Sequence, residues 1–99
     1  MAYRLNLPRK LRVQGWKVKI QGKERLEPPH ITVYHGEHVW RIGLRNRDFM
    51  VPPGGSWNDI DDEIRDLIED EDNWEELCEA WDRMYPSNPV SSEAEDDDA

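Results

Sequence analysis

A chain of 99 residues has room for one domain with a single hydrophobic core. Only 36% of its residues are hydrophobic, no apolar run is as long as a membrane span, and the first residues lack the apolar stretch of a signal peptide. We therefore expect neither membrane insertion nor export, and a cytoplasmic location. The net charge of −9 is divided unevenly, with +7 on residues 1–50 and −16 on residues 51–99.

The first predicted β-structure covers residues 11–20. Apolar and polar residues alternate there, and the phase of the alternation changes at Gly15, where a bulge or a tight turn is expected. Lys17 and Lys19 are then placed on one face and the apolar residues Trp16, Val18 and Ile20 on the other.

Two further strands are predicted over residues 30–35 and 38–45. Pro28-Pro29 cannot donate to a sheet, so the first of these strands begins at His30. Gly36-Glu37 is typical of a hairpin turn, which predicts antiparallel pairing of the two strands. Residues 49–51 are a candidate fourth strand, and the Pro-Pro-Gly-Gly sequence at residues 52–55 ends it.

Two acidic helices are predicted to follow. Ser56 with Asp59 is a capping signature for a helix that ends near residue 70, and Asn73 with Glu76 is a second one for a helix that Pro86 stops. The predicted fold is α+β, with an antiparallel sheet of three or four strands and the two C-terminal helices packed on one face. We expect a single domain over residues 1–86 and a disordered acidic tail over residues 87–99.

The strand alternation predicts a basic face on the side of the sheet away from the helices. Basic groups around an aromatic residue are typical of surfaces that bind single-stranded RNA, although a polar face that is merely solvated explains the same pattern. The candidate binding residues are Lys17, Lys19, His30, Tyr34, Arg41 and Arg45, with Thr32 between them and Arg47 just beyond. An acidic helical layer that offsets a basic sheet also explains the uneven charge.

Chemistry beyond binding depends on the histidines. His30 as a base and Arg41 as a phosphate clamp are candidate catalytic residues for RNA cleavage. We expect no metal site, because alternation sends His30 and His35 to opposite faces, and His35 with His38 is an incomplete ligand set. No cofactor is expected. The lone cysteine, Cys78, is interpreted as a small buried residue in a helix.

Four segments of the chain share a pattern with known sequences. They are Val13-Gln14-Gly15-Trp16-Lys17-Val18, Glu27-Pro28-Pro29-His30-Ile31-Thr32-Val33, Val39-Trp40-Arg41-Ile42 and Leu77-Cys78-Glu79-Ala80-Trp81. With these segments the chain resembles a family of short bacterial proteins of unknown function, which are often encoded beside toxin–antitoxin modules. The resemblance covers residues 11–86 and implies a toxin–antitoxin context without an established activity. Thr32 stands where the family commonly has a second histidine.

The leading hypothesis is a non-enzymatic binding module whose basic sheet face takes an anionic or protein partner. The alternative is a ribonuclease-like toxin that acts through the same face. A third hypothesis is a structural interaction protein whose acidic tail, from Ser87 to Ala99, imitates nucleic acid toward a basic partner.

Overall fold

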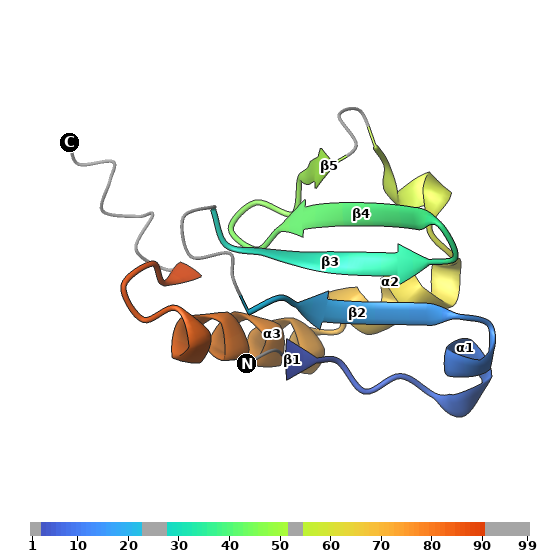
Figure 1. Cartoon of the computed structure of the whole chain (residues 1–99), viewed down its shortest axis with the longest axis horizontal. Helices are drawn as coiled ribbons and strands as arrows, with labels where there is room; N and C mark the ends of the chain where they lie inside the picture. Colours follow the sequence, from blue (N-terminus) through green and yellow to red (C-terminus); the bar gives the residue numbers. More distant parts are fainter. Residues whose placement is uncertain (1–2, 23–27, 52–54, 91–99) are drawn as a thin grey trace.

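The computed structural model describes residues 3–22, 28–51 and 55–90. The elements in chain order are β1 (Tyr3–Arg4), α1 (Arg9–Val13), β2 (Trp16–Ile20), β3 (His30–His35), β4 (His38–Gly43), β5 (Phe49–Val51), a 3₁₀ turn (Trp57–Asp59), α2 (Asp62–Glu69) and α3 (Glu71–Met84). Each strand pairs antiparallel with the next, so the sheet runs in chain order (Figure 1). The α+β class is confirmed, but the sheet has five strands where three or four were predicted.

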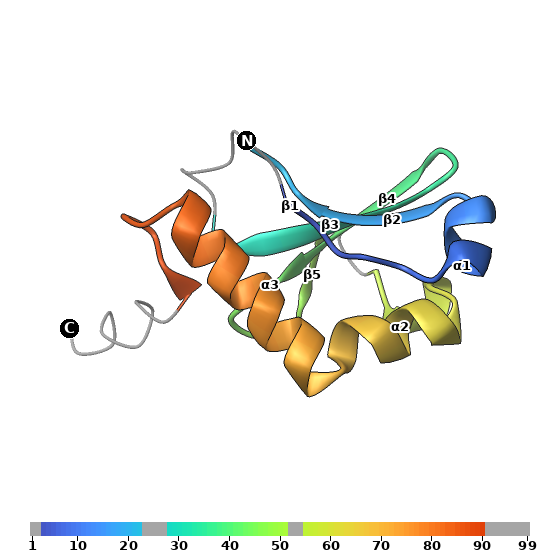
Figure 2. The same ribbon diagram turned by 90° about the horizontal axis from the view of Figure 1, so that it is seen from below.

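The sheet and the helices form two layers around one core. Helices α2 and α3 lie on the same side of the sheet (Figure 2). None of the described helices combines the length and the apolar character needed to cross a membrane. The hydrophobic side chains with no exposed surface come from both layers, and they are Val18, Ile20, Ile31, Val33, Ile42, Ile64, Ile68, Leu77 and Trp81.

Residues 9–13 form the short helix α1. The prediction that β-structure begins at Leu11 is therefore wrong for residues 11–13. Pro8 precedes the helix with φ −58°, a value that its ring fixes and that suits a helix start. Leu11 is 1% exposed whereas Val13 is 75% exposed, as expected for one buried side chain in a helical turn. The predicted turn at Gly15 is confirmed, with φ 94°, and strand β2 follows it.

Strand β1 was not predicted, because two residues are too few for a recognisable alternation. Tyr3 pairs with Ile20 and Arg4 pairs with Lys19, and the Leu5 amide then donates to the Val18 carbonyl at 2.9 Å. In contrast, the predicted hairpin of β3 and β4 is confirmed, with Gly36 at φ 62° in its two-residue turn.

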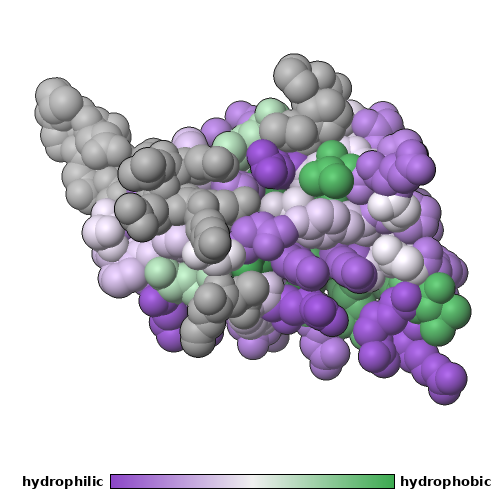
Figure 3. Space-filling model, in the orientation of Figure 1, coloured by the Kyte–Doolittle hydropathy of each residue, from purple (hydrophilic) through white to green (hydrophobic). Residues whose placement is uncertain are grey.

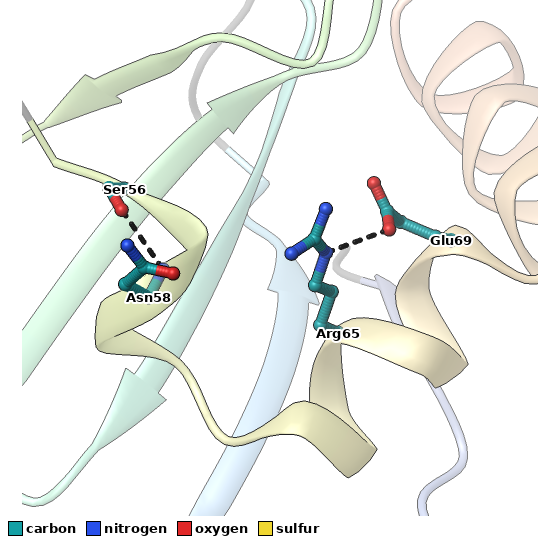
Figure 4. Close-up of polar contacts among 4 residues, drawn as sticks. All are labelled: Ser56, Asn58, Arg65 and Glu69. Atoms are coloured by element: carbon teal, nitrogen blue, oxygen red, sulfur yellow. Dashed lines mark hydrogen bonds and ion pairs between the residues drawn. The ribbon is translucent and has the colours of Figure 1, made fainter.

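The capping signature at Ser56 is present, but it caps a 3₁₀ turn instead of an α-helix. The Ser56 hydroxyl accepts from the Asn58 amide at 2.9 Å (Figure 4), and the Asp59 carboxylate accepts from the Ser56 amide. Ile60 is extended, so α2 begins separately at Asp62. The single helix predicted from residue 56 to 70 is therefore two elements.

Helix α2 ends and α3 begins at one residue, Asp70. Its carboxylate accepts from the amides of Asp72 and Asn73, at 3.0 and 3.2 Å. The N-cap is therefore Asp70 and not Asn73 as predicted. Along α2 itself, Arg65 donates to Glu69 at 2.9 Å, one helical turn away (Figure 4).

After α3 the chain turns back to the end of the sheet. Arg45 donates from Nε to the carbonyl of Val90 at 3.0 Å and from Nη2 to that of Pro89 at 2.9 Å. The indole of Trp81 donates to the Asn88 carbonyl at 2.7 Å. Packed structure thus reaches Val90, beyond the domain boundary predicted at residue 86, while residues 91–99 of the predicted tail lie outside the described residues.

Candidate anion-binding surface

Basic side chains lie in cross-strand rows on the sheet face that points away from α2 and α3. Cross-strand partners share a face with Cβ atoms about 5 Å apart. We use the name basic sheet face for Arg4, Lys17, Lys19, Tyr34 and Arg41, because register places Arg4, Lys19, Thr32 and Arg41 in one row and Lys17, Tyr34 and Val39 in the next. Figure 3 shows that the molecule is mainly hydrophilic on the side turned toward the viewer of Figure 1.

Tyr34 is held in place at the middle of this face. The Lys19 ammonium lies 5.5 Å from the centre of the Tyr34 ring, and the side-chain amide of Gln21 donates to the Tyr34 hydroxyl. These two contacts, one at the ring and one at the hydroxyl, restrict the orientation of the Tyr34 side chain. An aromatic ring fixed beside cations is the arrangement on which a nucleic-acid base can stack.

Two buried polar atoms beside Tyr34 have no hydrogen-bond partner within residues 3–22, 28–51 and 55–90. They are the Thr32 hydroxyl oxygen and Arg41 Nε. An unsatisfied buried donor costs about 1–3 kcal/mol, so this part of the face is not fully hydrogen-bonded within the described chain. Since both atoms are shielded from solvent, the contribution of the row to binding is its charge.

His30 does not belong to this face as predicted, because it is 0% exposed. Its ring lies 5.6 Å from that of Trp81 in α3, and its Nδ1–H donates to the Pro28 carbonyl at 2.9 Å. A base must reach the proton that it removes. The predicted catalytic pair of His30 and Arg41 is therefore not assembled at the surface.

Arg45 does not point to the basic sheet face either, because its guanidinium binds another part of the chain. Its guanidinium is engaged by residues 88–90, which leaves it a structural role at the end of the sheet. The prediction that Arg45 contributes to an open binding face is therefore wrong, because the return of residues 88–90 to the sheet has no signature in the sequence pattern.

The other two histidines stack on tryptophans. His35 lies against Trp16 with ring centres 4.0 Å apart, and His38 against Trp40 at 5.7 Å. Although register pairs His35 with His38, each ring packs on a different indole. The described residues contain no group of three side chains suited to hold a metal ion.

The thiol of Cys78 is half-buried beside the core. Burial raises its pKa to about 11, and the nearby charge of Asp82 acts in the same direction. A thiol needs a lowered pKa to act as a nucleophile at neutral pH. Cys78 is therefore suited to packing and not to covalent chemistry.

Arg4 is the member of the basic sheet face that sequence reasoning missed. Its place there depends on β1, which the pattern did not reveal. A weak signal was present, because Tyr3, Leu5 and Leu7 alternate with the polar residues Arg4 and Asn6.

Within residues 3–22, 28–51 and 55–90, the basic sheet face has no ion pair to a carboxylate. The ion pairs among these residues are Lys10–Glu63 and Arg65–Glu69, both at 2.9 Å, and neither involves a cation of this face. In the described part of residues 3–51 the acidic residues are Glu37 and Asp48, both outside the strands. Among the described residues, the positive charge of the face is therefore not paired with carboxylates.

No family model matches the chain, and comparisons with curated proteins and with solved structures also gave no match. The resemblance to short bacterial proteins near toxin–antitoxin modules therefore stays a prediction.

Proposed function

We propose that the protein is a small non-enzymatic binding module that holds single-stranded nucleic acid on its basic sheet face. The observation that carries this proposal is the alignment of Arg4, Lys19 and Arg41 in one cross-strand row, next to Lys17 and Tyr34, with no ion pair to a carboxylate of the described chain. Cations that follow a groove or face bind phosphates, and an aromatic ring among them stacks a base without reading sequence.

The net charge of −9 does not oppose this function at moderate salt. The acidic residues of α2 and α3 lie on the other side of the sheet (Figure 2). A nucleic acid bound to the basic sheet face is therefore closer to the cations than to these carboxylates. The Debye length is about 10 Å at 0.1 M salt, comparable with the thickness of one layer. At that ionic strength the near cations outweigh the far carboxylates.

A ribonuclease-like toxin was the alternative, and it needs an exposed proton acceptor near the phosphate. With His30 buried, the basic sheet face offers cations and a phenol but no imidazole. We therefore expect a labelled RNA to remain intact after incubation with the protein.

An NMR titration with a short single-stranded RNA at low and moderate salt tests the proposal. We expect shifts confined to the basic sheet face that weaken with salt. Replacing one phosphate-binding cation, as in Lys19→Gln or Arg41→Gln, should weaken binding and reduce the slope of log affinity against log salt by about 0.7.

Arg83→Gln is the matched control, because it removes the same charge from the exposed surface of α3. Absence of any shift at low salt would overturn the proposal. So would an equal loss of affinity in Arg83→Gln and Lys19→Gln, since the binding would then follow net charge and not this face. The oligomeric state of the free protein is measured by sedimentation alongside the titration. A dimer formed through the basic sheet face would prevent the RNA from binding there.

A further inference from the structure

A cleft of about 390 Å³ lies at the edge of the sheet where β1 ends, between the chain leading to α1 and strand β2. This volume is at the lower end of the range for small-molecule sites, so the cleft can hold one small group but not a long stretch of strand. We call it the edge cleft, and its lining residues are Arg4, Leu5, Asn6, Leu7, Arg12, Trp16 and Lys17.

The edge cleft combines an apolar floor with cationic walls. Leu5, Leu7 and Trp16 are 3–5% exposed and form part of the core. Exposed Arg4, Arg12 and Lys17 come from three different elements, β1, α1 and β2, and no carboxylate of the described residues lines the cleft with them. A concave site with a floor of low dielectric concentrates their positive potential.

Strand alternation directs the backbone groups of Trp16 toward this edge of the sheet. The Val18 carbonyl accepts from Leu5, so the backbone groups of Val18 point toward the β1 edge. In an antiparallel strand the groups of alternate residues point to the same edge, which directs those of Trp16 there too. Since β1 pairs only Tyr3 and Arg4 with β2, no β1 residue faces Trp16.

The charge of the edge cleft suits a phosphate monoester better than a diester. A diester in a strand carries one negative charge, whereas a monoester carries between about 1.5 and 2 at neutral pH. Arginine guanidinium groups, of which the cleft has two, match the oxygens of a terminal phosphate in a bidentate manner. Three cations around one hollow repel each other, and a dianion relieves this repulsion.

The edge cleft is continuous with the basic sheet face, because Arg4 and Lys17 belong to both. Arg12 lines the cleft from α1, which lies at the start of β2 (Figure 1). A strand lying on the face therefore reaches the cleft at one end. We infer that the edge cleft binds the terminal phosphate monoester of the bound strand, an inference that rests on the proposed function.

The test compares one oligonucleotide sequence with a 5′-phosphate, a 3′-phosphate or hydroxyl groups at both ends, together with a nucleoside monophosphate alone. A phosphate at one end should raise the affinity about tenfold, as one additional charge-assisted contact would. In Arg12→Gln this advantage should disappear, while the affinity for the hydroxyl-ended strand stays the same. Arg9→Gln is the matched control, because Arg9 is exposed on the same helix and does not line the cleft.

The results with the three oligonucleotides and the nucleoside monophosphate distinguish failure of the inference from failure of the proposed function. Equal affinity for all three strands overturns the inference and leaves the proposed function intact, as does a phosphate advantage that survives in Arg12→Gln. If no strand binds but the nucleoside monophosphate shifts Arg12 and Lys17, the cleft is a small-molecule phosphate site and the proposed function is wrong. If neither binds, both are wrong.

Discussion

The imidazole of His30 lies at the start of β3, enclosed by the end of α3. Its contacts include the Pro28 carbonyl and the indole of Trp81, and Trp81 donates in turn a hydrogen bond to the Asn88 carbonyl. The chain therefore uses this histidine as a buried aromatic residue that joins the sheet to the C-terminal helix. A residue chosen from sequence for catalysis thus has a role in stability.

Replacing His30 by alanine should lower the free energy of unfolding by about 2–4 kcal/mol, because a fully buried ring is removed and leaves a cavity. Urea denaturation measures this loss. His38→Ala is the control, since His38 is exposed and makes only a stacking contact with Trp40, so about 1 kcal/mol or less is expected. Equal stability of His30→Ala and the parent chain would contradict the assigned packing.

Tyr3 gives a residue-level prediction about pH. Burial, followed by a hydrogen bond to Glu76 and the charge of that carboxylate, raises the pKa of Tyr3 to about 12 from the ordinary value of 10.0. Between these values the unfolded chain releases the phenolic proton and the folded chain keeps it. The free energy of unfolding should therefore fall as the pH rises from 10 to 12.

The variant Tyr3→Phe has no proton to lose and should show a shallower decline over this pH range. Urea midpoints at several alkaline pH values measure it, and the difference between variant and parent cancels the titration of lysines and of Cys78. An identical decline in both proteins would show that the phenol of Tyr3 titrates in the folded state as it does in the unfolded one.

At the scale of elements, the corner between α2 and α3 depends on Asp70. This residue is both the C-cap of α2 and the N-cap of α3, and it accepts two backbone hydrogen bonds. Asp70→Ala should lower the free energy of unfolding by about 1 kcal/mol, whereas Asp70→Asn should retain most of it because asparagine is an equally good cap. Chemical denaturation of both variants provides the measurement, and a larger loss in Asp70→Asn than in Asp70→Ala would refute the capping role.

Elements defined by long alternation or by a turn were predictable, and elements defined by few residues were not. The β3–β4 hairpin follows from six-residue strands around Gly36, so Lys17, Lys19, Tyr34 and Arg41 were placed on the correct side. β1 has two residues and α1 has five, too few for periodicity to be recognised. Arg4 and Arg12 lie on these two elements, which is why the edge cleft was not foreseen.

The burial of His30 illustrates a second limit. Strand alternation assigns a side chain to a face, but it does not tell whether a distant segment covers that face. Here α3 and residues 85–90 lie at the end of the sheet, held by Arg45 and by the hydrogen bond from Tyr85 to the Gln21 carbonyl. Such contacts depend on the tertiary path of the chain and have no local signature.

At the scale of the whole molecule, the two layers carry opposite charge. The described chain up to Val51 has a basic sheet, and α2 and α3 together carry most of the acidic residues that follow. The layers attract each other, and the outer surface of the helical layer is mainly negative whereas that of the sheet is mainly positive. A molecule with this distribution orients an approaching anion toward the sheet even though its net charge is negative.

Residues 91–99 contribute five of the 22 acidic residues, so their removal changes the net charge from −9 to −4. A chain that ends at Val90 should therefore bind a single-stranded nucleic acid more tightly at low salt, mainly through faster association. The advantage should decrease as salt increases, because the Debye length falls from about 30 Å at 0.01 M to about 8 Å at 0.15 M. Stopped-flow association rates at several salt concentrations measure this effect.

A full-length variant with these five acidic residues changed to their amides separates charge from chain length. It should behave like the truncated protein, because the expected effect is electrostatic. If truncation accelerates binding and the amide variant does not, the segment acts by covering the face and not by its charge. Weaker binding after truncation would contradict the electrostatic argument, since removing negative charge can only lower the long-range repulsion of an anionic strand.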